Sequence, residues 1–248
     1  MLAISMPLSE LGFTNVKNEY SKFVSESAKT ILPSRLAMLI IYLPAFLVSL
    51  SFALFAPSYN FSYASSERAK MIVLSLMVVH FAKRCLEVLF VHKYSGSIPI
   101  DSMVPISITY SLVSLSLLYL QSSVNVTYDT ISTLGLAVAV LGMTGNLIHH
   151  IQLAQLRSHG SSSSSSKQGS RYAPPHGLLF DYSVCPHYLF EILEWIGFAL
   201  VSRTLGSYFV AFAFASYLMT RSFRTLQWYK QNVPNFMSNQ TALIPFVF

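Results

Sequence analysis

The residues of this chain that could do chemistry are ionisable side chains set in strongly apolar sequence. The clearest case is the stretch Cys185-Pro-His-Tyr-Leu-Phe-Glu-Ile-Leu-Glu-Trp195. Pro186 favours a helix start there, because its missing N–H would have no partner in the first turn. His187, Glu191 and Glu194 then follow at i, i+4 and i+7, which places them on one helix face. This pattern predicts either a polar cavity inside a membrane protein or a helix end that reaches the lipid headgroups.

A second apolar segment, His80-Phe-Ala-Lys-Arg-Cys-Leu-Glu87, repeats the pattern. It places a histidine, a basic pair and a carboxylate on one helix face. Glu87 can pair with Lys83 or Arg84 along the helix, which would be a purely structural use of these charges. Function is favoured over packing alone, because apolar residues would pack without the cost of burying charge.

A third segment, from Gly142 to Arg157, carries Asn146, His150 and Arg157 on one face over three turns. Asn146 and His150 lie deeper in the apolar sequence than Arg157, so they predict a polar cavity that opens to one side of a membrane. The neighbouring His149 points to another side of the helix, and the sequence has no His-x3-His spacing. With only two cysteines in the chain, this pattern predicts no metal site.

The composition predicts a membrane protein. Of the 248 residues, 53% are hydrophobic and 10% are charged, whereas soluble domains carry about 25% charged residues. The net charge of +6 could indicate nucleic acid, but the basic residues are scattered over loops between apolar segments. Orientation in a bilayer explains them better. We therefore expect the lipid bilayer as a partner and no nucleic acid.

The apolar segments predict an all-α fold, a polytopic membrane bundle of about six transmembrane helices. Each segment approaches the ~20 residues that cross a bilayer of ~30 Å, although the fifth is short. Residues 1–34 are expected to form a cytosolic or interfacial segment, and residues 35–248 the membrane-embedded domain. The predicted spans lie near Leu36–Ala56, Met71–Val91, Met103–Leu120, Thr130–Leu156, His187–Val201 and Leu205–Met219.

The positions of Lys and Arg predict the orientation. Eleven of the sixteen lie before the first span (residues 1–35), in the loops 92–102 and 157–185 and in the C-terminal part of the chain. The positive-inside rule then places both termini in the cytosol. Residues 158–170, with six consecutive serines, predict a flexible cytosolic loop. The apolar tail 241–248 is too short to span and is expected to dock on the protein or the membrane surface.

Four arginines converge on this predicted cytosolic face: Arg157, Arg171, Arg221 and Arg224. Guanidinium groups suit the phosphates of a phosphorylated cofactor or of a thioester carrier. The sequence has no Gly-rich dinucleotide fingerprint and no P-loop. A nucleotide would therefore be held by side chains from several helices.

Several motifs, jointly specific, carry a family resemblance. They are Phe180-x-Tyr-x-x-Cys-Pro-His-Tyr-x-x-Glu191-x-x-x-Trp195-Ile-Gly197, Gly145-Asn146 followed by Arg157, Tyr172 before Pro-Pro, and Leu243-Ile-Pro-Phe-x-Phe248. On these motifs the chain resembles the steroid 5α-reductase superfamily of integral membrane reductases, which includes very-long-chain enoyl-CoA reductases and polyprenol reductases. The resemblance covers roughly Leu36 to Phe248. It implies a helical fold in the endoplasmic reticulum membrane, with NADPH bound in a cavity open to the cytosol.

The resemblance also implies site residues. The segment from His80 to Ser95 is similar to the enoyl-CoA reductase branch, whose proposed catalytic pair matches Lys83 and Tyr188. The steroid enzymes hold their substrate with a Gln-Glu pair, and Ile41-Tyr42 stands at the aligned position here. The cofactor contacts of the family fall on Asn146, His150, Arg157, Tyr172, His187, Glu191, Arg221 and Tyr229.

The reaction implied is reduction of a C=C bond conjugated to a carbonyl in a lipid substrate such as a trans-2-enoyl-CoA. Hydride from NADPH reaches the β-carbon, and negative charge develops on the carbonyl oxygen. A hydrogen-bond donor at that oxygen stabilises the transition state more than the ground state. We expect Tyr188 to be this donor, with Lys83 holding its hydroxyl or favouring its ionised form. Protonation of the α-carbon would follow from Tyr188 or from water.

Three alternatives remain open from the sequence. The same chemistry could act on a 3-oxo-Δ4-steroid, or the chain could be a non-catalytic membrane relative. A transporter is disfavoured, because matching halves with broken helices are not apparent. The expected partners are the bilayer, a hydrophobic small molecule (acyl-CoA or steroid) and other enzymes of lipid elongation.

Overall fold

The structure, a computed structural model, describes residues 30–55, 65–94, 96–160, 175–233, 236 and 239–248. Within these ranges the side chains of residues 65, 66 and 157–160 are not described. The predicted N-terminal segment and most of the Ser-rich loop therefore lie outside the described residues. So does Tyr172, one of the residues predicted to contact the cofactor.

Helices dominate the described part of the chain, as the sequence predicts. One α-helix overlaps each of the six predicted spans. Three of these helices are long and apolar enough to cross a membrane, over Ser34–Phe55, Ile100–Ser123 and Thr130–Leu156, which is consistent with a membrane protein. The helices are α2 (Ser34–Phe55), α3 (Ser65–Leu86), α4 (Ile100–Ser123), α5 (Thr130–Gly160), α6 (Pro186–Ser202) and α7 (Leu205–Asn232).

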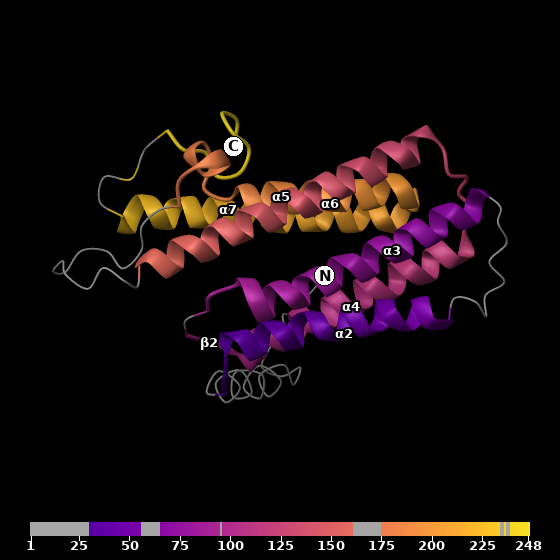
Figure 1. The fold of residues 1–248 in the computed structure, drawn as a ribbon, viewed down its shortest axis with the longest axis horizontal. Coiled ribbons are helices and arrows are strands. Elements are labelled where there is room, and N and C mark those ends of the chain that lie inside the picture. Colours follow the sequence, from indigo (N-terminus) through magenta and orange to yellow (C-terminus); the bar gives the residue numbers. More distant parts are fainter. Residues whose placement is uncertain (1–29, 56–64, 95, 161–174, 234–235, 237–238) are drawn as a thin grey trace, which may run out of the picture.

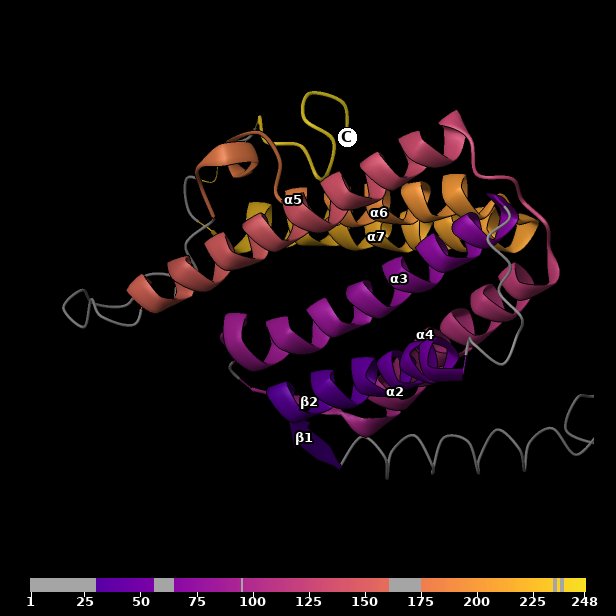
Figure 2. The ribbon, with the colours of Figure 1, turned by 45° about the vertical axis from the view of Figure 1, so that its right-hand side comes forward.

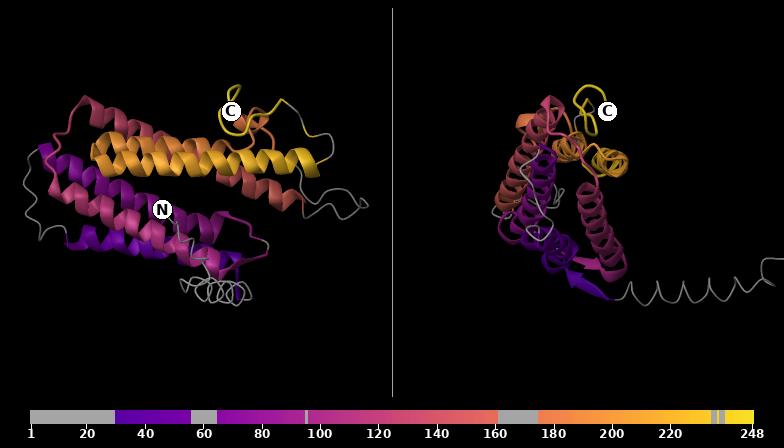
Figure 3. Two further views of the ribbon diagram at one scale, coloured as in Figure 1. Left: turned by 180° about the vertical axis from the view of Figure 1, so that it is seen from behind. Right: turned by 90° about the vertical axis from the view of Figure 1, so that its right-hand side faces the viewer.

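The six helices form two groups that meet along α3 and α6. In one group α2 packs against α3 and α4, and in the other α6 packs against α5 and α7 (Figures 1 and 2). The main contact between the groups is that of α3 with α6, and α4 also touches α7. Seen from behind, the helices lie roughly along the long axis of the molecule, as in a bundle (Figure 3).

Glycines allow α5 and α6 to pack backbone to backbone. A Cβ added at Gly142 would lie 2.4 Å from the backbone nitrogen of Glu194, and one at Gly197 would lie 2.4 Å from that of Ala139. Small residues at a helix contact permit this close approach, which is common where helices pack in membranes. As a result α5 and α6 are held close together, and the polar residues near the start of α6 face those near the end of α5.

The chain leaves α3 through a π-helical turn, η3 (Glu87–Val91). The backbone N–H of His92 donates to the carbonyl of Glu87 at 2.8 Å, an i to i+5 bond with one more residue than an α-helical turn contains. This extra residue shifts His92 around the helix axis relative to a regular α-helix. His92 then lies beside His150 of α5, with ring centroids 4.7 Å apart.

Two short strands depart from the all-α prediction. β1 (Ile31–Pro33) and β2 (Ser97–Pro99) pair antiparallel, with Leu32 opposite Ile98. They lie directly before α2 and α4 and tie the starts of these helices together. Three-residue strands are too short to give the alternating pattern by which strands are recognised in a sequence.

The C-terminal residues dock on the protein, one of the two outcomes expected from the sequence. The backbone N–H groups of Val184 and Cys185 donate to the carbonyls of Thr241 and Ala242 at 2.9 and 3.1 Å. Thr241 in turn donates to the carbonyl of Tyr182 at 3.0 Å. This pairing holds the segment that leads into α6, directly before His187 and Tyr188.

Candidate functional site

A cavity of about 520 Å³ lies at the end of the molecule that carries β1 and β2. All six α-helices contribute to its wall, and its lining combines apolar, aromatic and charged side chains. Such a mixture is typical of small-molecule sites, where a few polar groups orient a largely apolar ligand. The polar and aromatic lining residues include Tyr42, Arg84, His92, Tyr110, His150, His187, Tyr188, Glu191, Tyr217 and Arg221.

The hydroxyl of Tyr188 is held by an arginine. Arg221 donates from Nε to the Tyr188 oxygen at 2.6 Å and from Nη1 to the Tyr217 oxygen at 3.1 Å. Because the guanidinium can only donate, the Tyr188 oxygen is the acceptor and its own O–H remains available to a further partner. Both Tyr188 and Arg221 line the cavity.

The predicted pairing of Lys83 with Tyr188 is not what the structure shows. The Lys83 ammonium donates to Asn146 Oδ1 at 2.5 Å and pairs with Glu87 Oε1 at 3.0 Å. Lys83 is not among the cavity-lining residues. A carboxylate one turn along its own helix and an amide on α5 already coordinate the ammonium. The guanidinium at the Tyr188 hydroxyl is supplied by α7 instead.

Asn146 lies behind the cavity wall. Its Nδ2 donates to the backbone carbonyl of His187 at 2.9 Å, while its Oδ1 accepts from Lys83. The amide is 1% exposed, and it does not line the cavity. Asn146 therefore links α3 and α5 to the first turn of α6, where it fixes the backbone next to Tyr188.

Glu87 is the centre of a buried charge cluster. Its carboxylate lies 3.0 Å from Lys83 Nζ, 2.7 Å from Arg84 Nη1 and 3.2 Å from His150 Nδ1. The first two contacts confirm the pairing along the helix that the sequence suggested. At 1% exposure, a carboxylate without such partners would be costly.

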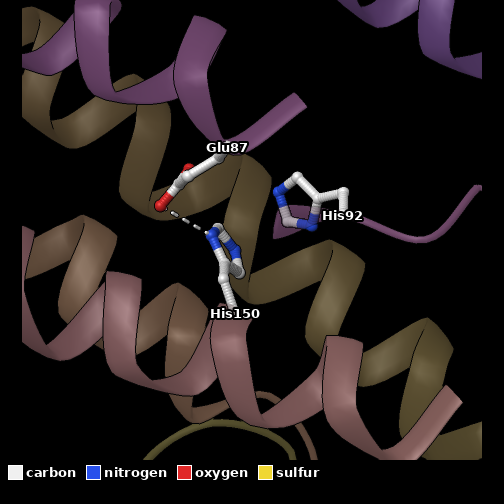
Figure 4. A group of neighbouring side chains, drawn as sticks. All are labelled: Glu87, His92 and His150. Carbon is white, nitrogen blue, oxygen red and sulfur yellow. Dashed lines mark ion pairs between the residues drawn. The ribbon is translucent and has the colours of Figure 1, made fainter. Parts of the chain in front are cut away.

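Glu87, His92 and His150 together have the residue types of a metal site, an arrangement that the sequence did not predict. Their ligand atoms lie within 4.8 Å of one another, and Figure 4 shows the three side chains gathered between α3, η3 and α5. Two cations, Lys83 and Arg84, already contact the carboxylate. Their charges oppose a third cation at this distance, so the cluster is better suited to protons than to a metal ion.

Arg84 also joins the cluster to the cavity. It donates from Nη2 to the Tyr42 hydroxyl at 2.6 Å, and its guanidinium lies 4.7 Å from the centroid of the same ring. The Tyr42 ring packs in turn against Tyr110, with centroids 5.4 Å apart. Tyr42 and Tyr110 therefore form an aromatic wall of the cavity that the sequence did not reveal. An aromatic at helical spacing in an apolar segment gives no signal of this kind.

The two glutamates on the predicted polar face of α6 lie in different surroundings. Glu191 lines the cavity at 5% exposure, and among the described residues its carboxylate has no hydrogen-bond or ion-pair partner. Glu194 does not line the cavity: one turn further into the bundle, it is fully buried and pairs with His80 Nδ1 of α3. Both residues lie on α6, but only Glu191 is open to a ligand.

A second hollow, a groove of about 710 Å³, runs along the outer face of α7. Tyr217 and Arg221 line both the groove and the cavity, so the two hollows meet at these residues. Tyr229, a predicted cofactor contact, lies in the groove with its ring 5.5 Å from that of Phe236. The groove residues are Ser216, Tyr217, Thr220, Arg221, Arg224, Thr225, Trp228 and Tyr229.

The structure therefore brings together many of the predicted site residues. His150, His187, Tyr188, Glu191 and Arg221 line one cavity. Asn146 and Lys83 support its wall from behind, and Tyr229 lies in the neighbouring groove. The side chain of Arg157, at the end of α5, is not described.

Comparison with known proteins finds relatives over most of the chain. A very-long-chain enoyl-CoA reductase of Dictyostelium discoideum is 31% identical over 188 residues, which are 72% of this chain and 58% of the relative. A putative enoyl-CoA reductase of Trypanosoma brucei brucei is 30% identical over 181 residues, 71% of this chain and 58% of the relative. The chain thus spans less than two thirds of the length of these two proteins.

A steroid enzyme is similar over a longer stretch. The 3-oxo-5-alpha-steroid 4-dehydrogenase 1 of Macaca fascicularis is 27% identical over 244 residues, which are 92% of this chain and 84% of the relative. The family described as 3-oxo-5-alpha-steroid 4-dehydrogenase matches residues 97–248, the part that contains α4 to α7. The chain therefore belongs to the 3-oxo-5-alpha-steroid 4-dehydrogenase family, which is the steroid 5-alpha-reductase family that its sequence motifs resemble.

Proposed function

We propose that this protein is a membrane-bound, NADPH-dependent reductase of a C=C bond conjugated to a carbonyl, acting on a lipid substrate such as a trans-2-enoyl-CoA. The observation that carries the proposal is that Tyr188 lines the cavity with its O–H available for a ligand while Arg221 holds its oxygen. Relatives named as enoyl-CoA reductases support the acyl-CoA substrate.

The residues around the two hollows fit a phosphorylated nicotinamide cofactor. The Glu191 carboxylate, which has no partner among the described residues, suits the amide N–H of a nicotinamide, and a buried carboxylate without any partner would otherwise be costly. Arg221 and Arg224 supply guanidinium groups in the α7 groove, which suit phosphates. NADPH, when bound, supplies the hydride. His150, His187, Tyr229, Arg157 and Tyr172 complete the proposed binding set, with Asn146 acting through His187.

Tyr188 supplies the electrophilic assistance in this proposal. Its O–H donates to the substrate carbonyl oxygen, on which charge develops when the β-carbon gains a hydride. The Tyr188 proton is then transferred to the α-carbon of the substrate. The saturated product thus gains one hydride and one proton in total. Arg221 stabilises the phenolate that remains, because its Nε–H donates to the Tyr188 oxygen. Lys83 keeps the start of α6 in place through Asn146.

The membrane setting of the proposal follows the charge distribution. We propose that all six helices cross the membrane of the endoplasmic reticulum, with both termini in the cytosol and the cavity open to that side. The cofactor and the polar head of an acyl-CoA would then enter from water, while the acyl chain stays near the bilayer. Association with other enzymes of lipid elongation belongs to the same proposal.

A steroid enone is the second candidate substrate, favoured by the similarity to the Macaca fascicularis enzyme over 92% of this chain. The same Tyr188 donor would serve the 3-oxo group. The cavity wall formed by Tyr42 and Tyr110 is the feature that would have to accommodate a rigid ring system.

The experiment that tests the proposal measures NADPH oxidation by the purified full-length protein in lipid nanodiscs, with a long-chain trans-2-enoyl-CoA and with a 3-oxo-Δ4-steroid. We expect oxidation with the enoyl-CoA. Oxidation with the steroid alone would select the second candidate. Oxidation with neither substrate, together with no NADPH binding, would support a non-catalytic relative.

Tyr188→Phe then tests the assigned donor. Because the donor to the developing charge is lost, turnover should fall by about 100-fold or more, with NADPH affinity largely retained. Tyr217→Phe is the matched control, since it removes the other phenol bound to Arg221, and we expect a much smaller loss. Full turnover by Tyr188→Phe would remove this residue from the mechanism.

A further inference from the structure

Three imidazoles lie in a row beside Tyr188 on the wall of the cavity. The ring centroids are 4.2 Å apart between Tyr188 and His187, 5.5 Å between His187 and His150, and 4.7 Å between His150 and His92. All four residues line the same cavity. If the proposed function holds, Tyr188 must regain a proton after every turnover, and the row of histidines leads away from it.

His150 has the surroundings of a proton carrier. Its Nδ1 lies 3.2 Å from Arg84 Nη1, which can only donate, and 3.2 Å from Glu87 Oε1, which can only accept as a carboxylate. With a proton on Nδ1 the ring is in ion-pair contact with Glu87, whose Oε1 has no hydrogen-bond partner among the described residues, and without that proton the ring accepts from Arg84. Both neutral tautomers therefore have a partner, and the proton can move between the two nitrogens at little cost.

Two other buried histidines show the opposite arrangement. His149, the next residue back along α5, points its Nδ1 at the carbonyl of Gly145 at 2.7 Å, and a carbonyl can only accept. His80 points its Nδ1 at the carboxylate of Glu194. Each of these rings is fixed with its proton on Nδ1, so neither can change tautomer without losing its bond. Of the two adjacent histidines on α5, only His150 has surroundings that permit exchange between the two tautomers.

The neighbours of His150 complete a path. The Nδ1 of His187 is buried and has no hydrogen-bond partner among the described residues, so none of these residues fixes its tautomer. His92 is half-buried at the other end of the row, in the cavity wall beside Lys93 and Tyr94. The charged groups around the row are Lys83, Arg84 and Glu87 of α3 and η3, Lys93 after η3, Glu191 of α6 and Arg221 of α7.

We infer that His150 returns the proton to Tyr188 through His187, and that His92 passes a solvent proton to His150. In each transfer one N–H bond breaks on the donor ring and one bond to hydrogen forms on the acceptor. In the last transfer the His187 N–H bond breaks and the Tyr188 O–H bond forms. Each turnover thus takes up one proton from solvent, which matches the proton that the reduced product carries. Water in the cavity can bridge the ring-to-ring steps.

A kinetic test separates proton return from hydride transfer. His150 also belongs to the proposed cofactor site, so in His150→Gln the first turnover at saturating NADPH serves as the reference for the later ones, because Tyr188 starts with its proton. Later turnovers should be at least about tenfold slower, since proton transfer by a positioned side chain contributes 10²–10⁴-fold. His149→Gln is the matched control and should slow neither phase. Equal slowing of both phases, or of neither, would overturn the inference.

A second test needs neither cofactor nor substrate. Nitrogen NMR of the wild-type protein in lipid, with ¹⁵N-labelled histidine, reports which ring nitrogen carries the proton. We expect His149 to show a single tautomer protonated on Nδ1, and His150 to exchange between both. Signals are assigned by their loss in His149→Gln and His150→Gln. A single fixed tautomer at His150 would overturn the inference even if the variants fold poorly.

The two proposals fail in different ways. A wild-type protein that oxidises no NADPH with either substrate contradicts the proposed function, while the NMR measurement still tests the tautomers of His150. A wild-type protein that turns over, combined with unchanged kinetics in His150→Gln, contradicts the proton path alone.

Discussion

Glu191 and Glu194 belong to the same helix, three residues apart, yet they lie in two different regions. Glu191 lines the cavity without a partner among the described residues. Glu194 is sealed in the bundle against His80, with the rings of Trp195 and Phe198 packed on that histidine at 5.2 and 6.0 Å. The first region leaves a carboxylate open to a ligand, and the second holds one in a pair inside the bundle.

The difference shows how a bundle in an apolar environment can use buried carboxylates in two ways. A paired carboxylate gives α3 and α6 one defined relative position, because a slip of either helix would leave both polar groups alone. An unpaired one costs stability unless a ligand or water completes it. Substitutions in the two regions should therefore separate stability from binding, and we take them from the largest expected effect to the smallest.

Glu194→Ala should cause the largest loss of stability. It leaves His80 buried without its acceptor, and breaking a buried pair typically costs 3–5 kcal/mol, so we expect a loss of about 3 kcal/mol. Thermal unfolding in detergent measures the loss. Glu191→Ala is the matched control, and its unfolding temperature should not fall, because no pair is broken among the described residues. Equal effects of the two variants would contradict the division of α6 into a sealed and an open region.

Gly142→Ala probes the same sealed region from the opposite helix. The new Cβ would lie 2.4 Å from the backbone nitrogen of Glu194, so α5 and α6 must move apart. Overpacking of this kind costs roughly 1–3 kcal/mol. Gly206→Ala is the control, because its nearest neighbour is the flexible side-chain end of Leu120. An unchanged unfolding temperature for Gly142→Ala would show that the helices are not held at this distance.

Glu191→Gln sharpens the comparison on the open side. The variant keeps the shape but loses the charge, so NADPH binding should weaken by about 10- to 100-fold, in line with the ~1.5–3 kcal/mol of a hydrogen bond to a charged group. Stability should not fall, because Glu191 has no partner to lose among the described residues. Isothermal titration with NADPH in nanodiscs measures the affinity. Unchanged affinity would remove Glu191 from the cofactor site.

The smallest effect is expected at Asp129, which lies far from both regions, in the connection between α4 and α5. The backbone N–H of Ser132 and then the Arg203 guanidinium hold the pKa of Asp129 below its ordinary value. Its stabilising effect is therefore present above the unfolded-state pKa, near 4, and is lost as pH falls through the lower folded-state pKa. The unfolding temperature of Asp129→Asn should fall less than that of the wild type between pH 5 and pH 3, read as the difference between the two curves. Identical curves would contradict this assignment.

The helices could be predicted from the sequence, because each lies in an apolar segment close to the length that crosses a bilayer. Periodicity likewise predicted that His187 and Glu191 share a face, and both line the cavity. Periodicity could not predict which residues of that face reach the cavity and which lie further inside the bundle. Glu194 lies on the same face of α6 as Glu191, but it is one turn further along the helix, where it contacts His80 of α3 instead of the cavity.

Side-chain contacts between different helices could not be predicted from the sequence for a related reason. A spacing along one helix does not say which neighbour meets it, so Arg221 was predicted as a cofactor contact and not as the partner of the Tyr188 hydroxyl. Lys83 was assigned to that hydroxyl from the family resemblance, whereas its ammonium donates a hydrogen bond to Asn146 on another helix. The position of His92 depends on the π-helical turn, which no apolar pattern reveals.

Because of the π-helical turn η3, the position of His92 depends more on the number of residues in the turn than on their types. Deleting any single residue between 88 and 91 would restore regular α-helical winding. The residues after the deletion would rotate about the helix axis by about 100°, one residue's share of a 3.6-residue turn. His92 would then swing off the cavity wall although every side chain around it was intact. Substitutions at residues 88–91 should therefore be tolerated better than a deletion there, whereas Glu87 is constrained by its charged partners.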